Sequence, residues 1–282
     1  MPELPEVESI KIQLERFLLG HTIAKVQVNH RKILTEGEDK LVGGKITAVR
    51  RFGKALAIDT NNGYSTVAHV KMTGQFIYRG PYLKAPPALP KKVAGGAPGK
   101  HTHVIFHLDK DGILYFNDYR RFGWIKVVKT SEVKSLPFIA SLGPEPLDGL
   151  THKHFSLLVS KTKRAIKLLL MDQTKIAGVG NIYANDALWL AKINPVRPAA
   201  SLSPREIKAL YSAIEKVLRQ AIKNGGSSEI AFVNPDGTEG SYQNHFLVYD
   251  REGEPCPRCR KAKIKKLRLG SRGTYFCPKC QK

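Results

Sequence analysis

The chain opens with apolar residues spaced three or four positions apart. Val7, Ile10, Leu14 and Phe17 follow this spacing, and Gly20 comes directly after the last turn. This spacing places one face of a helix against a core, and glycine is typical of a helix end. The pattern therefore predicts a first helix that ends near Gly20.

Short segments rich in β-branched and aromatic residues follow this helix. Turn signals separate several of them, such as Asn-Asn-Gly at residues 61–63 and Asp-Gly at residues 111–112. Many short strands closed by tight turns favour an antiparallel sandwich or barrel. The predicted strands cover residues 22–28, 45–50, 55–60, 65–70, 76–79, 103–108, 113–117 and 124–129.

Two stretches rich in proline interrupt these patterns. Residues 80–100 are rich in Pro, Gly, Ala and Lys, and we expect them to form a mobile loop. Residues 136–150 contain Gly-Pro-Glu-Pro and are interpreted as an interdomain linker.

Beyond residue 150 the apolar period becomes helical. Residues 161–171 carry apolar side chains on one side and cations on the other, and residues 182–191 follow a Gly-x-Gly turn. A capping box with proline at the first helical position, at residues 203–206, opens a helix that ends near residue 224. The polar residues 234–244 are interpreted as a loop.

Length and charge narrow the class of protein. The chain has 282 residues, enough for about two domains. Its 46 Lys and Arg residues against 24 Asp and Glu residues give a formal charge of +22, which favours a polyanionic partner such as nucleic acid. An anionic membrane surface is the rival, but no basic amphipathic helix with an exposed apolar face is evident. Without an apolar run or a signal peptide, we expect a cytoplasmic protein, associated with the nucleoid if bacterial.

The four cysteines form two Cys-x-x-Cys pairs near the end of the chain. Two thiolate pairs joined by a hairpin-length segment are typical of a tetrahedral zinc site. We predict one structural zinc ion, with Arg272 near the tip of the hairpin that the metal supports, positioned against phosphates. The predicted ligands are Cys256, Cys259, Cys277 and Cys280.

The first residues offer a nucleophile. If Met1 is removed, Pro2 carries a free secondary amine at a helix start, where the helix dipole opposes its protonation. Glu3 and Glu6 are three residues apart and lie on one side of the first turn. Proline and glutamate are also what an ordinary helix start prefers, so these residues alone leave both interpretations open.

Several further motifs are ambiguous by themselves. The Gly178-Val179-Gly180-Asn181 turn before a helix suits a phosphate but is also an ordinary turn. The turn at residues 117–123 carries Arg120 and Phe122, which suit a base edge and a base step. Met72, Lys54, His101 and His103 are each as compatible with core, surface or structural roles as with DNA contacts.

Together these residues resemble the formamidopyrimidine-DNA glycosylase and endonuclease VIII family of DNA repair enzymes. The opening Pro-Glu-Leu-Pro-Glu-Val-Glu, together with Met72, Arg120 and Phe122, resembles the formamidopyrimidine branch. The family motifs run along the whole chain: residues 2–8, Lys54, His69-x-x-Met72-x-Gly74, Lys100-His101-x-His103, Asp118-x-Arg120-Arg121-Phe122-Gly123, residues 142–147, residues 178–184 and the terminal cysteines.

The resemblance implies an α+β multidomain fold. It comprises an N-terminal antiparallel β-sandwich with flanking helices, a helix-two-turns-helix domain and a C-terminal zinc-ribbon finger. The expected divisions are a catalytic sandwich domain at residues 1–135, a linker at 136–150, a DNA-binding helical domain at 151–233, and a base-capping loop with the zinc finger at 234–282.

The resemblance also implies an activity and a set of site residues. It implies a bifunctional glycosylase and AP lyase that removes 8-oxoguanine and formamidopyrimidines from damaged double-stranded DNA as a monomer, through a Schiff base on Pro2. The implied catalytic residues are Pro2, Glu3, Lys54 and Arg272. The implied DNA contacts are Met72, His101, Arg120, Phe122, Lys163, Lys167 and Asn181, with Thr162 where relatives often carry lysine.

Two alternatives remain open from the sequence. One is an oxidised-pyrimidine glycosylase of the same family. The other is a zinc-finger DNA-binding protein without catalysis, against which Pro2, Glu3 and Lys54 argue.

Overall fold

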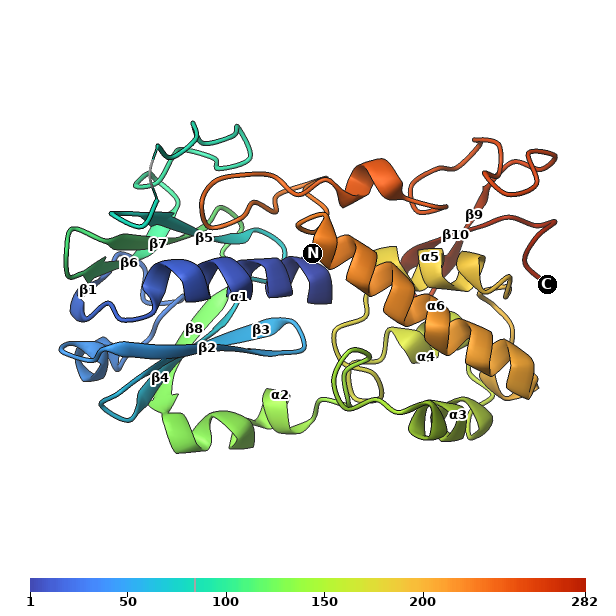
Figure 1. Ribbon diagram of the computed structural model, residues 1–282, viewed down its shortest axis with the longest axis horizontal. Coiled ribbons are helices and arrows are strands. Elements are labelled where there is room, and N and C mark those ends of the chain that lie inside the picture. Colours follow the sequence, from blue (N-terminus) through green and yellow to red (C-terminus); the bar gives the residue numbers. More distant parts are fainter. Residues whose placement is uncertain (84) are drawn as a thin grey trace. The chain divides into compact units, whose positions relative to one another are not determined.

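The computed structural model describes residues 1–83 and 85–282 of the chain (Figure 1). These residues form two units. Unit 1 contains Met1–Ala140 and Ile222–Gln243, and unit 2 contains Ser141–Ala221 and Asn244–Lys282. The domain limits expected at residues 135, 150 and 233 stay predictions, whereas the structure groups residues 222–243 with the N-terminal half.

Unit 1 is built on two four-stranded antiparallel sheets, as the short alternating segments predict. The strand orders are β1-β6-β7-β5 and β2-β3-β4-β8. All eight predicted strands are present, with ends shifted by at most two residues. Their bounds are β1 (Ile23–Val28), β2 (Ile46–Phe52), β3 (Ala55–Thr60), β4 (Tyr64–His69), β5 (Gly74–Arg79), β6 (Thr102–Leu108), β7 (Ile113–Asp118) and β8 (Trp124–Lys129).

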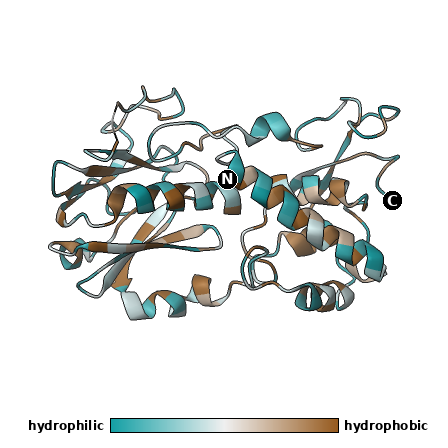
Figure 2. Ribbon diagram, viewed as in Figure 1, coloured by the Kyte–Doolittle hydropathy of each residue, from teal (hydrophilic) through white to brown (hydrophobic). Residues whose placement is uncertain are grey.

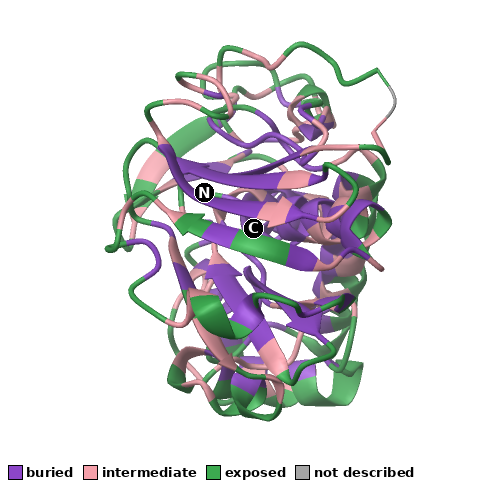
Figure 3. Ribbon diagram, turned by 90° about the vertical axis from the view of Figure 1, so that its left-hand side faces the viewer, coloured by how far each residue is buried: buried purple, intermediate pink, exposed green. Residues whose placement is uncertain are grey.

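Helix α1 (Leu4–Leu18) shares one core with both sheets. Its apolar residues Val7, Ile10, Leu14 and Phe17 are at most 1% exposed and pack with side chains from every strand. Figure 1 shows α1 running between the sheets, and Figure 3 shows the strands as largely buried. Burial of this apolar face fixes the position of α1 in the core. It thereby also fixes Pro2 and Glu3, which lie at the start of the helix.

The loop at residues 85–100 is anchored, in contrast to the predicted mobile loop. Val93 is 4% exposed and packs in a second apolar cluster with strand residues, and Leu89 and Ala97 lie against the same cluster. Leu89, Val93 and Ala97 are spaced four residues apart, a pattern that the abundance of proline and glycine hides. Lys84 lies outside the described residues.

Unit 2 contains the helices of the second half and the finger. The predicted helical stretch at 161–171 is reduced to α4, and an unpredicted helix, α3, precedes it. Thr151 caps α3, since its hydroxyl accepts a hydrogen bond from the amide of His154 at 3.2 Å. The element bounds are α3 (His152–Ser160), α4 (Ile166–Leu170), α5 (Asn181–Leu190), β9 (Lys265–Leu269) and β10 (Arg272–Phe276). Unit 1 also holds the short α2 (Pro137–Ala140).

Helix α6 (Pro204–Lys223) begins at the predicted capping box. The Ser203 amide donates to Glu206 Oε2 at 2.8 Å, and the Glu206 amide donates back to Ser203 Oγ at 3.4 Å. Figure 2 shows hydrophilic and hydrophobic residues alternating along this helix, whose apolar face contributes to the interior of unit 2.

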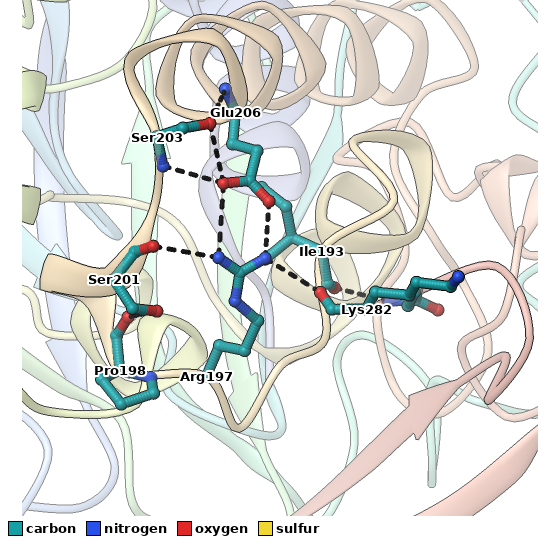
Figure 4. Close-up of polar contacts among 8 residues, drawn as sticks. Ile193, Arg197, Pro198, Ser201, Ser203, Glu206 and Lys282 are labelled. Atoms are coloured by element: carbon teal, nitrogen blue, oxygen red, sulfur yellow. Dashed lines mark hydrogen bonds and ion pairs between the residues drawn. The ribbon is translucent and has the colours of Figure 1, made fainter.

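Arg197 fixes the start of α6 (Figure 4). Its guanidinium donates to Glu206 Oε1 at 2.5 Å and Oε2 at 3.3 Å, and to the backbone carbonyls of Ser201 and Lys282 at 3.1 Å each. This bidentate contact lowers the pKa of Glu206 to about 2. The carboxylate is therefore charged over the physiological pH range.

Within the described part of the chain, no helix combines the length and the apolar character that crossing a membrane requires.

We predict that Glu206→Gln lowers the free energy of unfolding by about 1 to 2 kcal/mol at pH 7, a value reduced for solvent screening because the Glu206 side chain is 32% exposed. The folded-state pKa lies below the ordinary value, so the contribution of the carboxylate is complete above about pH 4.5. It falls as the pH drops toward 2.

Urea unfolding of both proteins from pH 7 to pH 3 measures this contribution. Glu132→Gln, at an exposed position, is the control. A stability difference between wild type and Glu206→Gln that stays constant down to pH 3 would contradict the assignment.

Candidate active site and nucleic-acid interface

Two glutamates form a capping box at the start of α1. The Glu3 side chain accepts a hydrogen bond from the Glu6 backbone amide, and the Glu3 amide donates to Glu6 Oε2 at 2.7 Å. Both residues are buried, at 4% and 1% exposure. Pro2 is buried beside them, whereas Met1 is 44% exposed. Both carboxylates are therefore held at the helix start that directly follows Pro2 in the sequence.

The second carboxylate oxygen of Glu6 binds a distant part of the chain. Glu6 Oε1 accepts from the Ser227 amide at 2.8 Å. Gly226 packs so tightly here that an added Cβ would lie 2.9 Å from Glu6 Cγ and 3.1 Å from Glu6 Cα, and its φ of +77° also requires glycine. Glu6 therefore stabilises the helix start, as expected, and also fastens residues 226–227 to it.

Lys54 is the second residue of the two-residue turn between β2 and β3. Arg51 braces this turn, since its guanidinium donates to the Gly53 carbonyl at 3.1 Å and to Glu8 of α1 at 2.5 Å. Lys54 is 7% exposed, so it is more deeply placed than an ordinary surface lysine.

The positive charge of Lys54 contributes to the low pKa of the nearby His69. Burial, together with the charges of Lys71 and Lys54, lowers the pKa of His69 to about 3. Its Nδ1 accepts from the Lys71 amide at 3.0 Å. The neutral imidazole therefore leaves the local positive charge on the two lysines.

Met72, Arg120 and Phe122 come together at the surface of unit 1. Arg120 Nη1 donates to Met72 Sδ at 3.5 Å, and its Cζ lies 4.6 Å from the centre of the Phe122 ring. Met72 is 36% exposed and Phe122 is 52% exposed. The structure thus joins residues that are far apart in the sequence into one exposed cation flanked by apolar groups.

Asp118 holds the turn that carries Arg120. This buried carboxylate accepts from the Gly123 amide at 2.6 Å, from the Arg120 amide at 3.2 Å and from the Thr73 hydroxyl. It therefore joins the turn of Arg120 to the turn of Met72, because Thr73 adjoins Met72.

The two histidines of the 100–103 motif differ in place. His103 Nε2 donates to the Asp118 carbonyl at 2.8 Å, so this ring has a structural contact. His101 is half-buried, with its ring 6.3 Å from that of Tyr119.

In unit 2 the Gly178–Asn181 turn is shaped by a residue that the sequence did not indicate. Gln173 accepts from the Gly178 amide at 2.9 Å and donates to the Val179 carbonyl at 2.7 Å. Asn181, half-buried, is the first residue of α5, one residue before the predicted helix start, and this helix start presents backbone N–H donors.

Lys167 lies inside unit 2, whereas a phosphate contact had been predicted. It is fully buried, and its ammonium donates to the Gly273 carbonyl at 2.8 Å and to Thr274 Oγ1 at 2.7 Å. Both partners are in β10, directly after Arg272. A buried ammonium needs such partners, so in this structure Lys167 supports the finger hairpin. Lys163 is exposed.

The finger hairpin turns at Gly270 and Ser271, both with positive φ. Arg272, the first residue of β10, is exposed, close to the predicted tip. Asn185 of α5 accepts from the Tyr275 amide at 2.9 Å, so α4 and α5 both fix this hairpin. Arg272 is thereby held relative to Asn181 within unit 2.

The four cysteines converge as predicted. Their sulfur atoms all lie within 4.8 Å of one another, with 3.9 Å between Cys256 and Cys280 and 3.8 Å between Cys259 and Cys277. A tetrahedron of thiolates about 2.3 Å from zinc has sulfur separations of about 3.8 Å. The residues therefore fit one structural zinc ion.

Some positioning residues carried no signal in the sequence. Asn185 and Lys92 act through contacts with residues far away along the chain, and such contacts leave no local period. Gln173 binds Gly178 and Val179 nearby, but this contact follows no repeating pattern of residue types. The Glu6 and Gly226 pair is similar, since neither residue indicates the other until the fold joins them.

Three family models match the chain in order. The formamidopyrimidine-DNA glycosylase N-terminal domain matches residues 1–125, and the formamidopyrimidine-DNA glycosylase H2TH domain matches residues 142–232. The zinc finger found in FPG and IleRS matches residues 253–282.

Full-length relatives and solved structures agree with these matches. Formamidopyrimidine-DNA glycosylases from Lactiplantibacillus plantarum and Pelotomaculum thermopropionicum are 41% and 43% identical, covering 99% and 100% of this chain and 98% and 99% of theirs. A Lactococcus lactis Fpg bound to DNA containing an oxidised pyrimidine superposes with a TM-score of 0.85 at 34% identity, covering 100% of both chains. The MutM (Fpg) protein of Thermus thermophilus gives 0.85 at 37% identity, covering 99% of this chain and 98% of that chain.

We predict that Gly226→Ala lowers the free energy of unfolding by about 2 to 4 kcal/mol, because it adds crowding against Glu6 to the strain of a positive φ. Gly63→Ala is the matched control. Its φ is +87° and no atom lies within 4 Å of the added Cβ, so we expect a loss of about 1 to 2 kcal/mol. Denaturant unfolding measures both, and equal losses would refute the tight contact.

Cys277→Ser should release the zinc and loosen the finger hairpin, since metal binding contributes folding energy to such small modules. Metal analysis should show a loss of about one zinc per chain, and hydrogen exchange should rise in β9 and β10. Lys279→Ser, at an exposed position between two ligands, is the control and should retain both zinc and protection. A protected hairpin without metal would contradict the structural role.

Proposed function

The chain belongs to the formamidopyrimidine-DNA glycosylase family of DNA repair enzymes, and we propose that it excises oxidised purines, 8-oxoguanine and formamidopyrimidines, from damaged duplex DNA as a monomer. It is a DNA glycosylase with the lyase activity general to this family. The observation that carries the proposal is the start of α1, where Pro2 adjoins the paired carboxylates of Glu3 and Glu6.

Removal of Met1 would convert Pro2 into the nucleophile. The exposure of Met1 supports access to this bond, and its removal leaves the ring nitrogen facing the space that Met1 occupies. At the positive end of α1, a secondary amine is less readily protonated, so its lone pair is available for attack.

The proposed reaction is a substitution at C1′ followed by two eliminations. The Pro2 nitrogen forms a bond to C1′ of the damaged nucleotide while the glycosidic bond breaks, and the departing base takes a proton. The nitrogen gives up its proton and its lone pair then expels O4′ from C1′, so the sugar ring opens to an iminium. Glu3 delivers the proton that O4′ takes up, which requires a carboxylate within hydrogen-bond reach. Loss of a C2′ proton from the iminium then releases the 3′ phosphate, and a second elimination releases the 5′ phosphate. Lys54 and Arg272 are the proposed proton donor and phosphate contact in these steps.

The cluster of Met72, Arg120 and Phe122 supports base extrusion. An exposed phenyl ring and thioether suit the space left in a base stack, and the guanidinium between them suits the base edge left unpaired. Extrusion costs a few kcal/mol, which such contacts offset. We propose that these three side chains replace the damaged nucleotide.

Phosphate contacts would come from both units. In unit 2 we propose Asn181 at the start of α5, with Lys163 and Arg272 as exposed cations. Lys167 would act through the hairpin that it supports, because its ammonium is occupied by Gly273 and Thr274. In unit 1, His101 is the proposed contact. The net charge of +22 favours such a polyanionic partner.

Oxidised pyrimidines are a second candidate substrate class. The Lactococcus lactis relative was crystallised with DNA containing an oxidised pyrimidine. Single-turnover excision from matched duplexes carrying 8-oxoguanine or thymine glycol compares the two classes, and faster excision of thymine glycol would overturn the purine assignment.

Borohydride trapping tests the nucleophile. With an 8-oxoguanine duplex, the enzyme from which Met1 has been removed should form a covalent adduct whose peptide map places the DNA on Pro2. Pro2→Gly should reduce trapping at least tenfold, since the secondary amine is lost. Pro5→Gly changes the other proline of the same helix start and should trap normally.

Mass spectrometry of the N-terminus must accompany this test. Protein that retains Met1 has no free amine on Pro2 and should not trap. An adduct that forms equally well with Met1 retained would exclude Pro2 as the nucleophile.

A further inference from the structure

The loop at residues 85–100 packs against residues 228–239 within unit 1. Val93 of the loop and Val233 of the segment share one apolar cluster with Ile77 and Tyr115. Leu89 lies against Gly237, where an added Cβ would approach its Cδ2 to 3.0 Å. The loop therefore forms one wall of the surface on which this segment rests.

Lys92 joins the two ends of the 228–239 segment. Its ammonium donates to the Ser228 carbonyl and, at 2.8 Å, to Glu239 Oε2. Gln75 extends this contact, since its side-chain amide donates to the Ala231 carbonyl at 2.6 Å and to the Lys92 carbonyl at 3.0 Å. One cation thus bridges the first and the last residue of the 228–239 segment.

Further bonds join residues 227–228 to residues 239–241, and these two short stretches form the neck of the segment. The Gly240 amide donates to Ser228 Oγ at 2.8 Å, and Ser227 pairs with Ser241 as an isolated β-bridge. Beyond this neck Ile230 is 59% exposed. The segment is therefore held firmly at its base while it presents an apolar side chain to solvent.

The neck adjoins the proposed catalytic residues. Ser227, whose amide donates to Glu6 at the start of α1, is the direct neighbour of Ser228, whose carbonyl accepts from Lys92. Glu6 thus fixes Ser227 from the side of α1, whereas Lys92 fixes Ser228 from the side of the 85–100 loop. The two anchors are separate, so Ser227 keeps its bond to Glu6 when Lys92 is lost.

We propose that Lys92 is a positioning residue that sets the 228–239 segment over an extruded base, so that the 85–100 loop determines how efficiently a base is held for excision. This inference rests on the proposed function. Lys92 touches neither the base nor the sugar and acts through Ser228 and Glu239. An abasic site carries no base to hold, so its cleavage does not need this segment in place.

The test compares two duplexes of the same sequence, one with 8-oxoguanine and one with a preformed abasic site. We expect Lys92→Met to slow single-turnover excision of 8-oxoguanine about tenfold, the size expected from losing a charged hydrogen-bond donor. Strand cleavage at the abasic site should change less than about twofold. Lys91→Met, at the exposed neighbouring position, removes the same charge and should leave both reactions unchanged.

Hydrogen exchange in the DNA-free protein gives a readout that does not depend on activity. Amides of residues 228–239 should exchange faster in Lys92→Met than in Lys91→Met, while α1 stays protected. Glu239→Gln should have a smaller effect on excision, and the double variant with Lys92→Met should be no worse than Lys92→Met alone.

The outcomes separate this inference from the proposed function. Equal losses on both duplexes, unchanged exchange or strictly additive losses in the double variant would each overturn the role of Lys92. If the wild-type protein cleaves the abasic site but leaves 8-oxoguanine untouched, the proposed substrate is wrong and the excision part of this inference falls with it. The exchange measurement then decides whether Lys92 holds the segment.

Discussion

The Glu6 carboxylate is the contact on which the site in unit 1 depends. One of its oxygens binds the amide of Glu3 and the other binds the amide of Ser227, so a single buried anion joins the first residues to a segment more than two hundred positions later. A buried carboxylate is stable only when its oxygens are satisfied, and both partners here are backbone donors at fixed positions. This requirement explains why Gly226 has no room for a side chain and why the 228–239 segment starts where it does.

Unit 2 uses the same principle with the opposite charge. The Lys167 ammonium is buried and satisfied by β10, and the zinc site closes the other end of the finger hairpin. The exposed Arg272 therefore stands on a strand that a cation, a metal and the Asn185 side chain all hold. The backbone of Arg272 is fixed in this way, while its side chain stays exposed.

Much of the fold followed from local patterns, because alternation and turn chemistry are properties of neighbouring residues. The eight strands, the capping box of α6 and the converging cysteines belong to this class. Helix α3 was missed because its first turn is polar and its N-cap is a lone threonine. The anchoring of residues 85–100 was missed because proline and glycine hide three apolar residues whose partners lie in distant strands.

The residues of the candidate site also fall into two groups, those with a local pattern in the sequence and those without one. The cysteines occur at a spacing typical of their ligand, so the residues alone predict the zinc site, whereas Pro2 and Glu3 became candidates only through the motifs along the rest of the chain. Lys167 was expected from the family resemblance to contact DNA, yet it is buried and bound to β10 in this structure. Lys92 had no distinguishing neighbour at all, and its two partners are known only from the folded chain.

The exposed thioether of Met72 has a consequence for the conditions in which such an enzyme works. Its sulfur accepts a hydrogen bond from Arg120, and the residue is 36% exposed, so we expect peroxide to reach this side chain. Conversion to the sulfoxide would add a polar oxygen, a stronger acceptor for the guanidinium and a poorer filler of an apolar gap. The agents that damage guanine would therefore also stiffen and polarise the side chains proposed to replace it, and reductive repair of methionine would restore them.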